Sequence, residues 1–253
     1  MTQAERRASG SRNGIRRTLT RPARPGPRAG CAHFHMIALR YHSTLHPKPG
    51  CYNLISSHTS MAFGPAYYRK FYLDPATRVV TAAEMRARAR LIGAILSHAA
   101  VPVRTILDAG CGIGLLRKPF AEVLPRARYT GLDSSEYLCA RYGWVRGSVA
   151  DYAPRRASDL VVCYDVLQYL DDREAARAVA NLGRLTRAAL YVSALTREDW
   201  RSNCDRGRTD RAVHLRPGEW YRRRLRRRFN YLGFGVWLRK DAAAIIWDLE
   251  RPA

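Results

Sequence analysis

Residues 105–114 read Thr-Ile-Leu-Asp-Ala-Gly-Cys-Gly-Ile-Gly, and this stretch decides the fold. A short apolar run bounded by turn residues is typical of a buried strand in a parallel sheet. Three glycines then stand at alternate positions, 110, 112 and 114, ahead of a segment with helical character. Glycines at such a turn let the backbone bend tightly and let a ligand lie against its N–H groups. The stretch predicts an α/β domain with a ligand site at this turn.

Helix and strand patterns alternate on both sides of this stretch, from residue 61 onward. Strands are expected at 105–110, 129–133, 144–147, 159–166 and 188–194, and helices at 82–100, 114–124, 134–142 and 172–186. This alternation indicates a Rossmann-like, doubly wound sheet that is mostly parallel, with helices on both faces. The segments 229–238 and 242–249 follow each other with no helix between them, which predicts a C-terminal antiparallel strand pair.

Residues 1–60 have a different composition. They hold ten Lys or Arg residues and one acid, Glu5, for a net charge of +9, and Pro and Gly interrupt them at 21–30. Such a segment cannot bury enough apolar surface to offset its conformational entropy. We therefore expect a basic, disordered leader at 1–60 and a folded domain at 61–253. Two interpretations of the leader stay open: an organelle-targeting segment, or translation that begins at Met61 so that the leader is not part of the protein.

The overall composition excludes several classes of protein. The chain has 253 residues, 47% of them hydrophobic, with 44 Lys and Arg against 21 Asp and Glu, a net charge of +23. No apolar run approaches the roughly 18 residues of a membrane span. The six cysteines are scattered, which argues against a disulfide scaffold and favours the reducing cytoplasm. Five of the seven histidines fall in the leader with Cys31 and Cys51, at spacings that match no zinc finger, so no metal site is expected.

The glycine spacing distinguishes between nucleotide-binding families. A dinucleotide-binding G-x-G-x-x-G pattern would need glycine at 115, where the chain has leucine, and the pattern is instead D-x-G-x-G-x-G from Asp108 to Gly114. This pattern resembles the class I S-adenosylmethionine (SAM)-dependent methyltransferases, and the resemblance covers about residues 61–250. It implies SAM as cofactor, held by a turn made of Gly110, Cys111, Gly112 and Gly114. Asp108 would orient the amino end of SAM or hold the turn.

Further segments extend the resemblance. Asp133 ends the second predicted strand, 19 residues after Gly114, where a carboxylate can accept hydrogen bonds from both ribose hydroxyls, with Ser134 beside it. The segment 145–152 resembles the one that wraps adenine and brings in Ser148 and Val149, although family members often have an acid where Ser148 stands. Tyr164 closes the fourth strand, beside the methionine part of the cofactor.

The resemblance implies transfer of the sulfonium methyl group by in-line displacement. Asp165 is the candidate catalytic residue, in an electrostatic or proton-accepting role, with capping of the turn as the alternative. The aromatic segment at 65–74 would fold over SAM as a lid, with Tyr68 as its contact residue. Packing of that segment on the sheet is the competing interpretation.

The acceptor is expected to be a small molecule, read by the long polar segment at 196–211. Two alternatives stay open. One is an RNA or protein methyltransferase, for which the basic cluster at 220–229 would be a contact surface. The other is a non-catalytic nucleic-acid-binding protein that uses the net charge of +23. The absence of an Asn/Asp-Pro-Pro-Tyr signature counts against methylation of nucleic-acid amines. The pattern leaves the acceptor and the oligomeric state undetermined.

Overall fold

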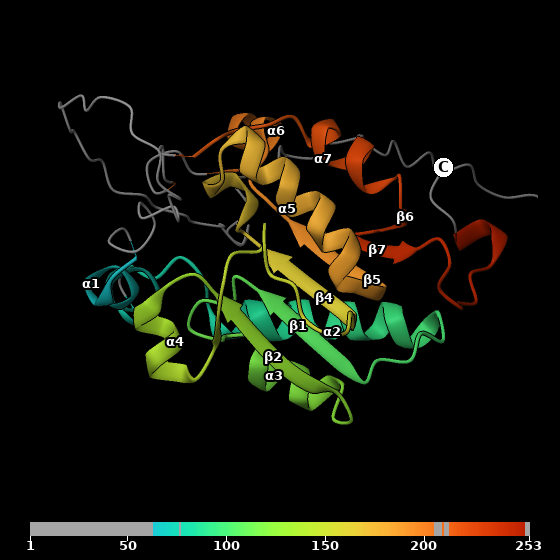
Figure 1. The fold of residues 1–253 in the computed structure, drawn as a ribbon, viewed down its shortest axis with the longest axis horizontal. Coiled ribbons are helices and arrows are strands. Elements are labelled where there is room, and N and C mark those ends of the chain that lie inside the picture. Colours follow the sequence, from blue (N-terminus) through green and yellow to red (C-terminus); the bar gives the residue numbers. More distant parts are fainter. Residues whose placement is uncertain (1–62, 76, 205–208, 210–212, 251–253) are drawn as a thin grey trace, which may run out of the picture. The chain divides into compact units, whose positions relative to one another are not determined.

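A seven-stranded sheet lies at the centre of the computed structural model, which describes residues 63–75, 77–204, 209 and 213–250 (Figure 1). The predicted leader at 1–60, which contains five histidines and the cysteines Cys31 and Cys51, lies outside the described residues. The strands are β1 (Thr105–Ala109), β2 (Arg128–Asp133), β3 (Val145–Arg146), β4 (Ser158–Tyr164), β5 (Thr186–Ser193), β6 (Phe229–Gly233) and β7 (Val236–Arg239).

The sheet order is β3-β2-β1-β4-β5-β7-β6. The pairs from β3 to β5 are parallel, and β7 pairs antiparallel with both β5 and β6. The order reverses between β1 and β4, because the chain builds outward from β1 through β2 and β3 and then returns to β4. This confirms the predicted Rossmann-like sheet with an antiparallel C-terminal pair. It is the arrangement in which ligands bind where the order reverses.

Helices cover both faces of the sheet. They are α1 (Pro65–Tyr68), α2 (Ala82–His98), α3 (Arg117–Val123), α4 (Glu136–Tyr142), α5 (Asp172–Leu185), α6 (Arg197–Ser202) and α7 (Gly218–Leu225). A π-helical turn (Arg69–Leu73) and two short 3₁₀ turns (Leu167–Tyr169 and Asp248–Glu250) complete the elements. Within the described parts of the chain, every helix is too short or too polar to span a bilayer.

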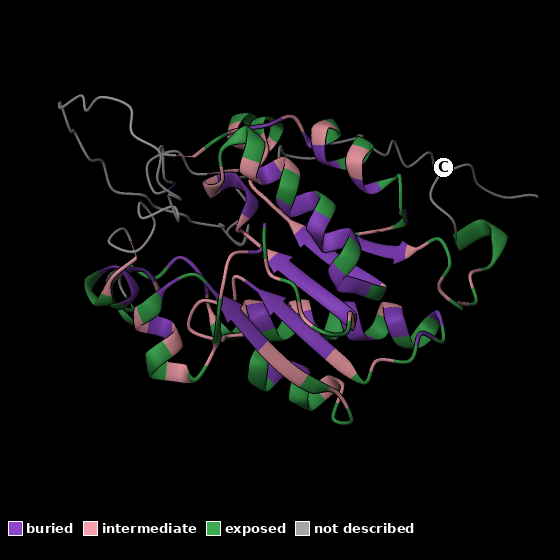
Figure 2. Cartoon of the chain, viewed as in Figure 1, coloured by how far each residue is buried: buried purple, intermediate pink, exposed green. Residues whose placement is uncertain are grey.

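Strand alternation divides the apolar core into two layers. In β4, Leu160 and Val162 pack with α2 and α3, whereas Val161 and Cys163 pack with α5 and α7. Successive side chains of a strand point to opposite faces, so a strand buried on both faces is apolar throughout. Figure 2 shows the central strands buried along most of their length, with the helices exposed on their outer sides.

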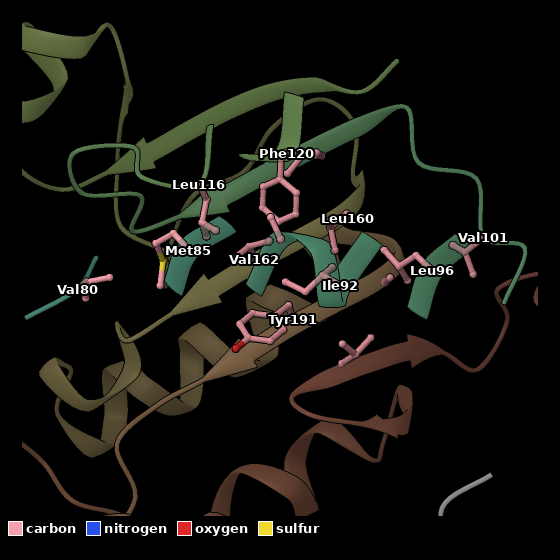
Figure 3. Packing of buried hydrophobic residues seen from close by; sticks show 14 of the residues in the cluster. Val80, Met85, Ile92, Leu96, Val101, Leu116, Phe120, Leu160, Val162 and Tyr191 are labelled. Atoms are coloured by element: carbon pink, nitrogen blue, oxygen red, sulfur yellow. The ribbon is translucent and has the colours of Figure 1, made fainter. Parts of the chain in front are cut away.

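Helix α2 supplies most of the first layer. Its N-terminus carries a capping box, in which the Thr81 hydroxyl accepts the backbone N–H of Glu84 and the Glu84 carboxylate accepts that of Thr81. From this start, Met85, Ile92 and Leu96 face the sheet and meet residues of α3 and β4 (Figure 3). This layer fixes α2 beside the carboxyl ends of β1 and β4.

Asp159 joins three strands at the opposite end of the sheet. Its buried carboxylate accepts hydrogen bonds from the N–H groups of Arg104 and Thr105, from the Thr105 hydroxyl and from the guanidinium of Arg187. Burial alone would raise the pKa of Asp159, but these hydrogen bonds hold the pKa below its ordinary value. The starts of β1, β4 and β5 are thereby tied together.

The predicted C-terminal strands are wrong in position. The antiparallel hairpin lies wholly within 229–239, and residues 242–247 form no strand. The apolar run there is largely solvent-facing, with Ile245 and Trp247 exposed. Helical spacing from Tyr221 through Leu225 and Phe229 to Leu232 would favour one continuous helix, but α7 ends at Leu225 and the chain continues as β6.

Candidate functional site

The candidate site lies where β1 and β4 end side by side at the reversal of the sheet order. The turn after β1 supplies Asp108, Gly110 and Gly112, and the end of β4 supplies Tyr164 and Asp165. All five residues line one cavity of about 70 Å³. The topology thus brings together two segments that are more than fifty residues apart in the chain.

The three glycines of the turn have different surroundings. All have positive φ, at +83° for Gly110, +54° for Gly112 and +75° for Gly114. A Cβ added to Gly110 would lie 2.2 Å from Val166 Cγ2, and one added to Gly114 would lie 2.6 Å from Trp144. A Cβ added to Gly112 would meet no atom within 4 Å. Gly110 and Gly114 therefore serve the packing of the protein itself, and Gly112 faces open space.

Trp144 supports this turn and was missed by the sequence analysis. Its indole N–H donates to the backbone carbonyl of Gly112 at 2.9 Å. Its ring packs so close to Gly114 and Gly131 that neither position has room for a Cβ. These two glycines, one on the turn and one on β2, leave the room that the indole ring of Trp144 occupies.

Asp133 ends β2 and holds the turn from the other side. One carboxylate oxygen accepts the N–H of Gly112 at 2.9 Å, and the other accepts the N–H of Ser135 at 2.8 Å. The residue is 7% exposed, and burial raises its pKa against these hydrogen bonds. Ser134, predicted beside it, is exposed.

The aromatic segment at 65–74 packs over this side of the site. Tyr67, Tyr68 and Phe71 are buried in the core layer of α2, and Tyr72 lines the cavity. Burial and the nearby charge of Asp133 raise the pKa of Tyr68, and a hydrogen bond with Ser135 opposes that shift. The segment therefore packs on the domain, as the competing interpretation expects, and Tyr72 forms part of the cavity wall; its role as a lid over SAM stays a prediction.

Asp108 is a buried carboxyl at the end of β1. It is 3% exposed and accepts a hydrogen bond from the hydroxyl of Tyr129. Burial raises its pKa to about 7; the Tyr129 hydrogen bond lowers the pKa and the charge of Asp133 raises it. At neutral pH this group is divided between its neutral and its charged form. Cys111, next along the turn, also has a raised pKa because it is buried.

Asp165 has an unusual backbone conformation. Its φ is +56°, in the left-handed region that aspartate tolerates better than most residues, and its N–H donates to the Ser193 carbonyl at 2.8 Å. Burial raises the pKa of Asp165 to about 6, against hydrogen bonds with Tyr164 and Gln168 and the positive charge of Arg88. A carboxyl with this pKa is mostly ionised at neutral pH and still basic enough to accept a proton.

Arg88 is a second residue that the sequence analysis missed. Its guanidinium carbon lies 4.1 Å from the centre of the Tyr164 ring, and the group donates a hydrogen bond to the Tyr191 hydroxyl. It comes from α2, one turn after Met85. Nothing in the sequence distinguishes this arginine from the exposed arginines of the same helix, because only the fold places it over the ends of β4 and β5.

Ser148 and Val149 lie outside the cavity. The Ser148 hydroxyl accepts the N–H of Ala150 at 3.1 Å, and the Val149 side chain is buried in the layer of α5. The segment is nevertheless anchored beside the site, because the N–H of Gly147 donates to the Asp133 carbonyl at 2.9 Å. Elsewhere in the described residues, no three Asp, Glu, His or Cys side chains are grouped as a metal site would need.

A second cavity, of about 360 Å³, lies where β5 ends and β7 begins. Ser193, Asp199, Tyr221, Phe234 and Trp237 contribute to its walls. This cavity adjoins the first site. The Ser193 carbonyl accepts the hydrogen bond of the Asp165 N–H, and the negative charge of Asp199 raises the pKa of Asp165. Part of the polar segment predicted to read the acceptor, at 205–208 and 210–212, lies outside the described residues.

Residues 107–188, which include the glycine turn, Asp133 and Asp165, match the family model described as a methyltransferase domain. Over this third of the chain, the sequence is similar to methyltransferase domains. The sheet order of the chain is that of the class I SAM-dependent methyltransferases.

The chain has similar curated relatives and solved structures. Over 113 residues it is 33% identical to the trans-aconitate 2-methyltransferase of Acidovorax ebreus (strain TPSY) and 32% identical to that of Acidovorax sp. (strain JS42). Each match covers 42% of this chain and 39% of the relative, so the chain spans well under half the length of these proteins.

Among solved structures, magnesium protoporphyrin IX methyltransferase from Synechocystis PCC 6803 with bound S-adenosylhomocysteine is similar at a TM-score of 0.50 and 19% identity. That match covers 68% of this chain and 93% of that one. It shows the shared fold.

The two kinds of glycine in the turn predict different effects of an added methyl group. Gly112→Ala should cost about 1–2 kcal/mol of unfolding free energy, for the left-handed backbone alone. Gly110→Ala should cost about 1–3 kcal/mol more, because its Cβ overlaps Val166. Urea denaturation of both variants measures the difference. Equal losses would contradict the assignment of Gly110 to internal packing.

Proposed function

We propose that this chain is a SAM-dependent methyltransferase that acts on a small-molecule acceptor. The observation that carries the proposal is the pairing of Gly112 and Asp133. Gly112 leaves open space above a left-handed turn, and the Asp133 carboxylate is fixed beside that turn by two backbone N–H groups. A turn without side chains next to an oriented carboxylate suits a nucleoside whose ribose hydroxyls donate hydrogen bonds.

The residues fit SAM along its length. The ribose would lie on Asp133 and beside Ser134, with adenine toward the segment of Ser148 and Val149. The turn from Gly110 through Cys111 and Gly112 to Gly114 would carry the middle of the cofactor. The ammonium group would lie near Asp108, and the sulfonium toward Tyr164 and Asp165. Buried carboxyls are costly when ionised, and a cation next to them offsets that cost. Three of them in one crevice favour a ligand with positive charge.

Entry of the cofactor requires the aromatic segment to move. The cavity of about 70 Å³ is smaller than the roughly 300 Å³ at which small-molecule sites begin. Tyr72 of the π-helical turn lines it, and Tyr68 of α1 packs against Tyr72 with ring centres 5.6 Å apart. We infer that this segment opens for SAM and then covers it, which excludes water from the transfer step.

SAM supplies a methyl group already activated by the positive sulfur, so the protein chiefly orients the reactants. Asp165 stands at the methyl end, where its carboxylate accepts the proton of an acceptor that must lose one, such as a hydroxyl or an amine; a carboxylate acceptor is already deprotonated at neutral pH and needs no base there. Arg88, stacked on Tyr164, keeps a positive charge near Asp165 and favours its ionised form.

The cavity of about 360 Å³ is the proposed acceptor site, because its size is that of small-molecule sites and its walls reach Asp165 through Ser193 and Asp199. The relatives named for trans-aconitate suggest that small carboxylic acids are the first acceptors to test. We further propose that residues 61–253 form the catalytic domain, that the leader at 1–60 is dispensable for it, and that the reaction takes place in the cytoplasm.

The proposed activity is tested by supplying tritiated-methyl SAM with metabolite pools, including small carboxylic acids, and with RNA pools. Label in the small-molecule fraction supports the proposal. Label in RNA alone would favour the nucleic-acid alternative, and absence of label together with absence of SAM binding would refute both.

SAM affinity should depend on the charge of Asp133. Asp133→Asn removes the negative charge and one of the two acceptor oxygens, and binding should weaken about 10- to 100-fold, at about 1.5–3 kcal/mol for a charge-assisted bond. Glu136→Ala is the matched control, because Glu136 is exposed and pairs only with Arg146 on the surface. Calorimetry measures both. Parallel weakening in the two variants would remove Asp133 from the site.

SAM binding should release protons near neutral pH. Asp108 is half protonated at about pH 7, and an ammonium group placed beside it lowers its pKa, so its proton leaves on binding. Calorimetry at pH 7 in phosphate and in Tris should report about half a proton released per SAM bound. Asp108→Asn should abolish the release. Identical heats in the two buffers for the native protein would contradict this role.

Turnover should follow the ionisation of Asp165. The rate should rise with pH through about 6 and level off above it, since only the carboxylate accepts a proton. Asp165→Asn should lower kcat by about 10²–10⁴-fold and remove this acid limb. Asp241→Asn, which changes an exposed carboxylate paired with Arg239 after β7, should change neither. If Asp165→Asn turns over at the native rate, the acceptor needs no base at this position.

A further inference from the structure

Helix α7 divides its positive charge between two sides. Glu219 accepts hydrogen bonds from Arg222 and from Arg226, each at 3.0 Å, and neutralises much of that side. On the other side lie Arg224 of α7, Arg227 and Arg228 of the turn that follows α7, and Arg184 of α5. None of these four forms an ion pair among the described residues. The basic cluster of the sequence is therefore an uncompensated group of four guanidinium groups drawn from two elements.

These four arginines line a groove of about 620 Å³ between α5 and the end of α7, which we call the arginine groove. Its lining contains no acidic residue. The rest of the lining is apolar or small, with Val179, Leu225 and Phe229 beneath and Ala176, Ala180 and Gly183 along α5. Gly183 gives room to the side chain of Arg228 on this wall, since a Cβ on Gly183 would lie 2.7 Å from Arg228 Cδ.

Two of the guanidinium groups are held in place before any ligand arrives. Arg224 donates to the Trp220 carbonyl at 3.1 Å, and its guanidinium carbon lies 3.7 Å from the centre of the Trp220 ring. Arg184 donates to the side-chain oxygen of Asn181 at 3.2 Å. Burial and the positive charges of Arg223 and Arg227 lower the pKa of Arg224. Positioned cations that repel one another are stabilised by a bound anion.

We propose that the arginine groove binds a small organic diphosphate that carries an apolar group, at a site separate from the methyl-transfer crevice. Guanidinium forks match phosphate oxygens, and four of them suit a ligand with several negative charges. The volume lies within the range of small-molecule sites, and the accessible side chains of Ala176 and Ala180 on α5 would contact a hydrocarbon part. The chain has 21 acidic against 44 basic residues, so it has few carboxylates with which to neutralise these arginines.

The same features argue against an RNA strand as the occupant. Single strands are held by exposed aromatic rings on which successive bases stack, along a continuous basic track. The aromatic residue of the groove, Phe229, is 2% exposed, and the nearby Trp220 ring is already covered by Arg224. The groove is short and concave, which suits a compact ligand.

Geranyl diphosphate is the probe for this site, with inorganic diphosphate and geraniol as its separate parts. Calorimetry on the full chain should show binding of geranyl diphosphate, weaker binding of diphosphate and none of geraniol. Arg184→Ala/Arg227→Ala should weaken binding about 100-fold, at roughly tenfold for each lost charge-assisted contact. Ala180→Trp, which fills the groove without changing charge, should weaken geranyl diphosphate more than inorganic diphosphate.

Arg173→Ala/Arg223→Ala is the matched control. It removes one exposed arginine from each of the same helices, but neither residue lines the groove. Equal weakening by the two double variants would mean that net charge alone attracts the ligand and would overturn the proposal. So would binding that is insensitive to Ala180→Trp. Binding of anionic-lipid vesicles or RNA, with geranyl diphosphate not bound, would assign the arginines to a macromolecular surface instead.

Discussion

The hydrogen bond from the Gly112 N–H to Asp133 Oδ2, 2.9 Å long, joins the turn after β1 to the end of β2. Trp144 holds the same residue from behind through the Gly112 carbonyl. Both polar groups of one backbone residue are thus used to fix its orientation, and its open face is left toward the crevice. The other parts of the site are arranged around this fixed point, with Asp108 behind it and the aromatic segment above it.

The crevice is acidic inside a strongly basic protein. Asp108 and Asp165 have raised pKa values because burial disfavours their charged forms. A carboxyl whose pKa is raised on folding contributes stability below its unfolded pKa, and this contribution is lost as pH rises through about 6 to 7. At neutral pH the site therefore costs stability in the free protein. A ligand with positive charges recovers part of that cost, which links the chemistry of the crevice to the cation proposed for it.

The sequence was sufficient for the features that depend on local pattern. The positions of the first five strands, the glycine turn and the position of Asp133 follow from apolar runs and spacing, and the structure brings Asp108, Gly112, Asp133 and Asp165 to one edge of the sheet. Trp144 and Arg88 were not found, because a lone aromatic at a helix end and one arginine among many carry no periodic signal. Their positions depend on contacts between elements distant in the chain.

The errors near the C-terminus have a similar cause. Leu225 and Phe229 are four residues apart, a spacing that keeps two side chains on one face of either a helix or a strand. The pattern could not show that α7 ends between them. The apolar run at 242–249 resembles a strand, but β6 remains the edge strand on that side of the sheet and residues 242–247 do not pair with it.

Helix α7 lies between the cavity of about 360 Å³ and the arginine groove. Tyr221, Arg222 and Leu225 line the cavity beside Asp165, whereas Arg224, Leu225 and Arg227 line the arginine groove, so that Leu225 belongs to both walls. A shared wall cannot shift toward one occupant without changing the space left for the other. Any such effect is reciprocal, since the free energy that couples two ligands is the same whichever binds first. A shift of the eight-residue helix α7 would change the space available in the acceptor cavity and in the arginine groove together.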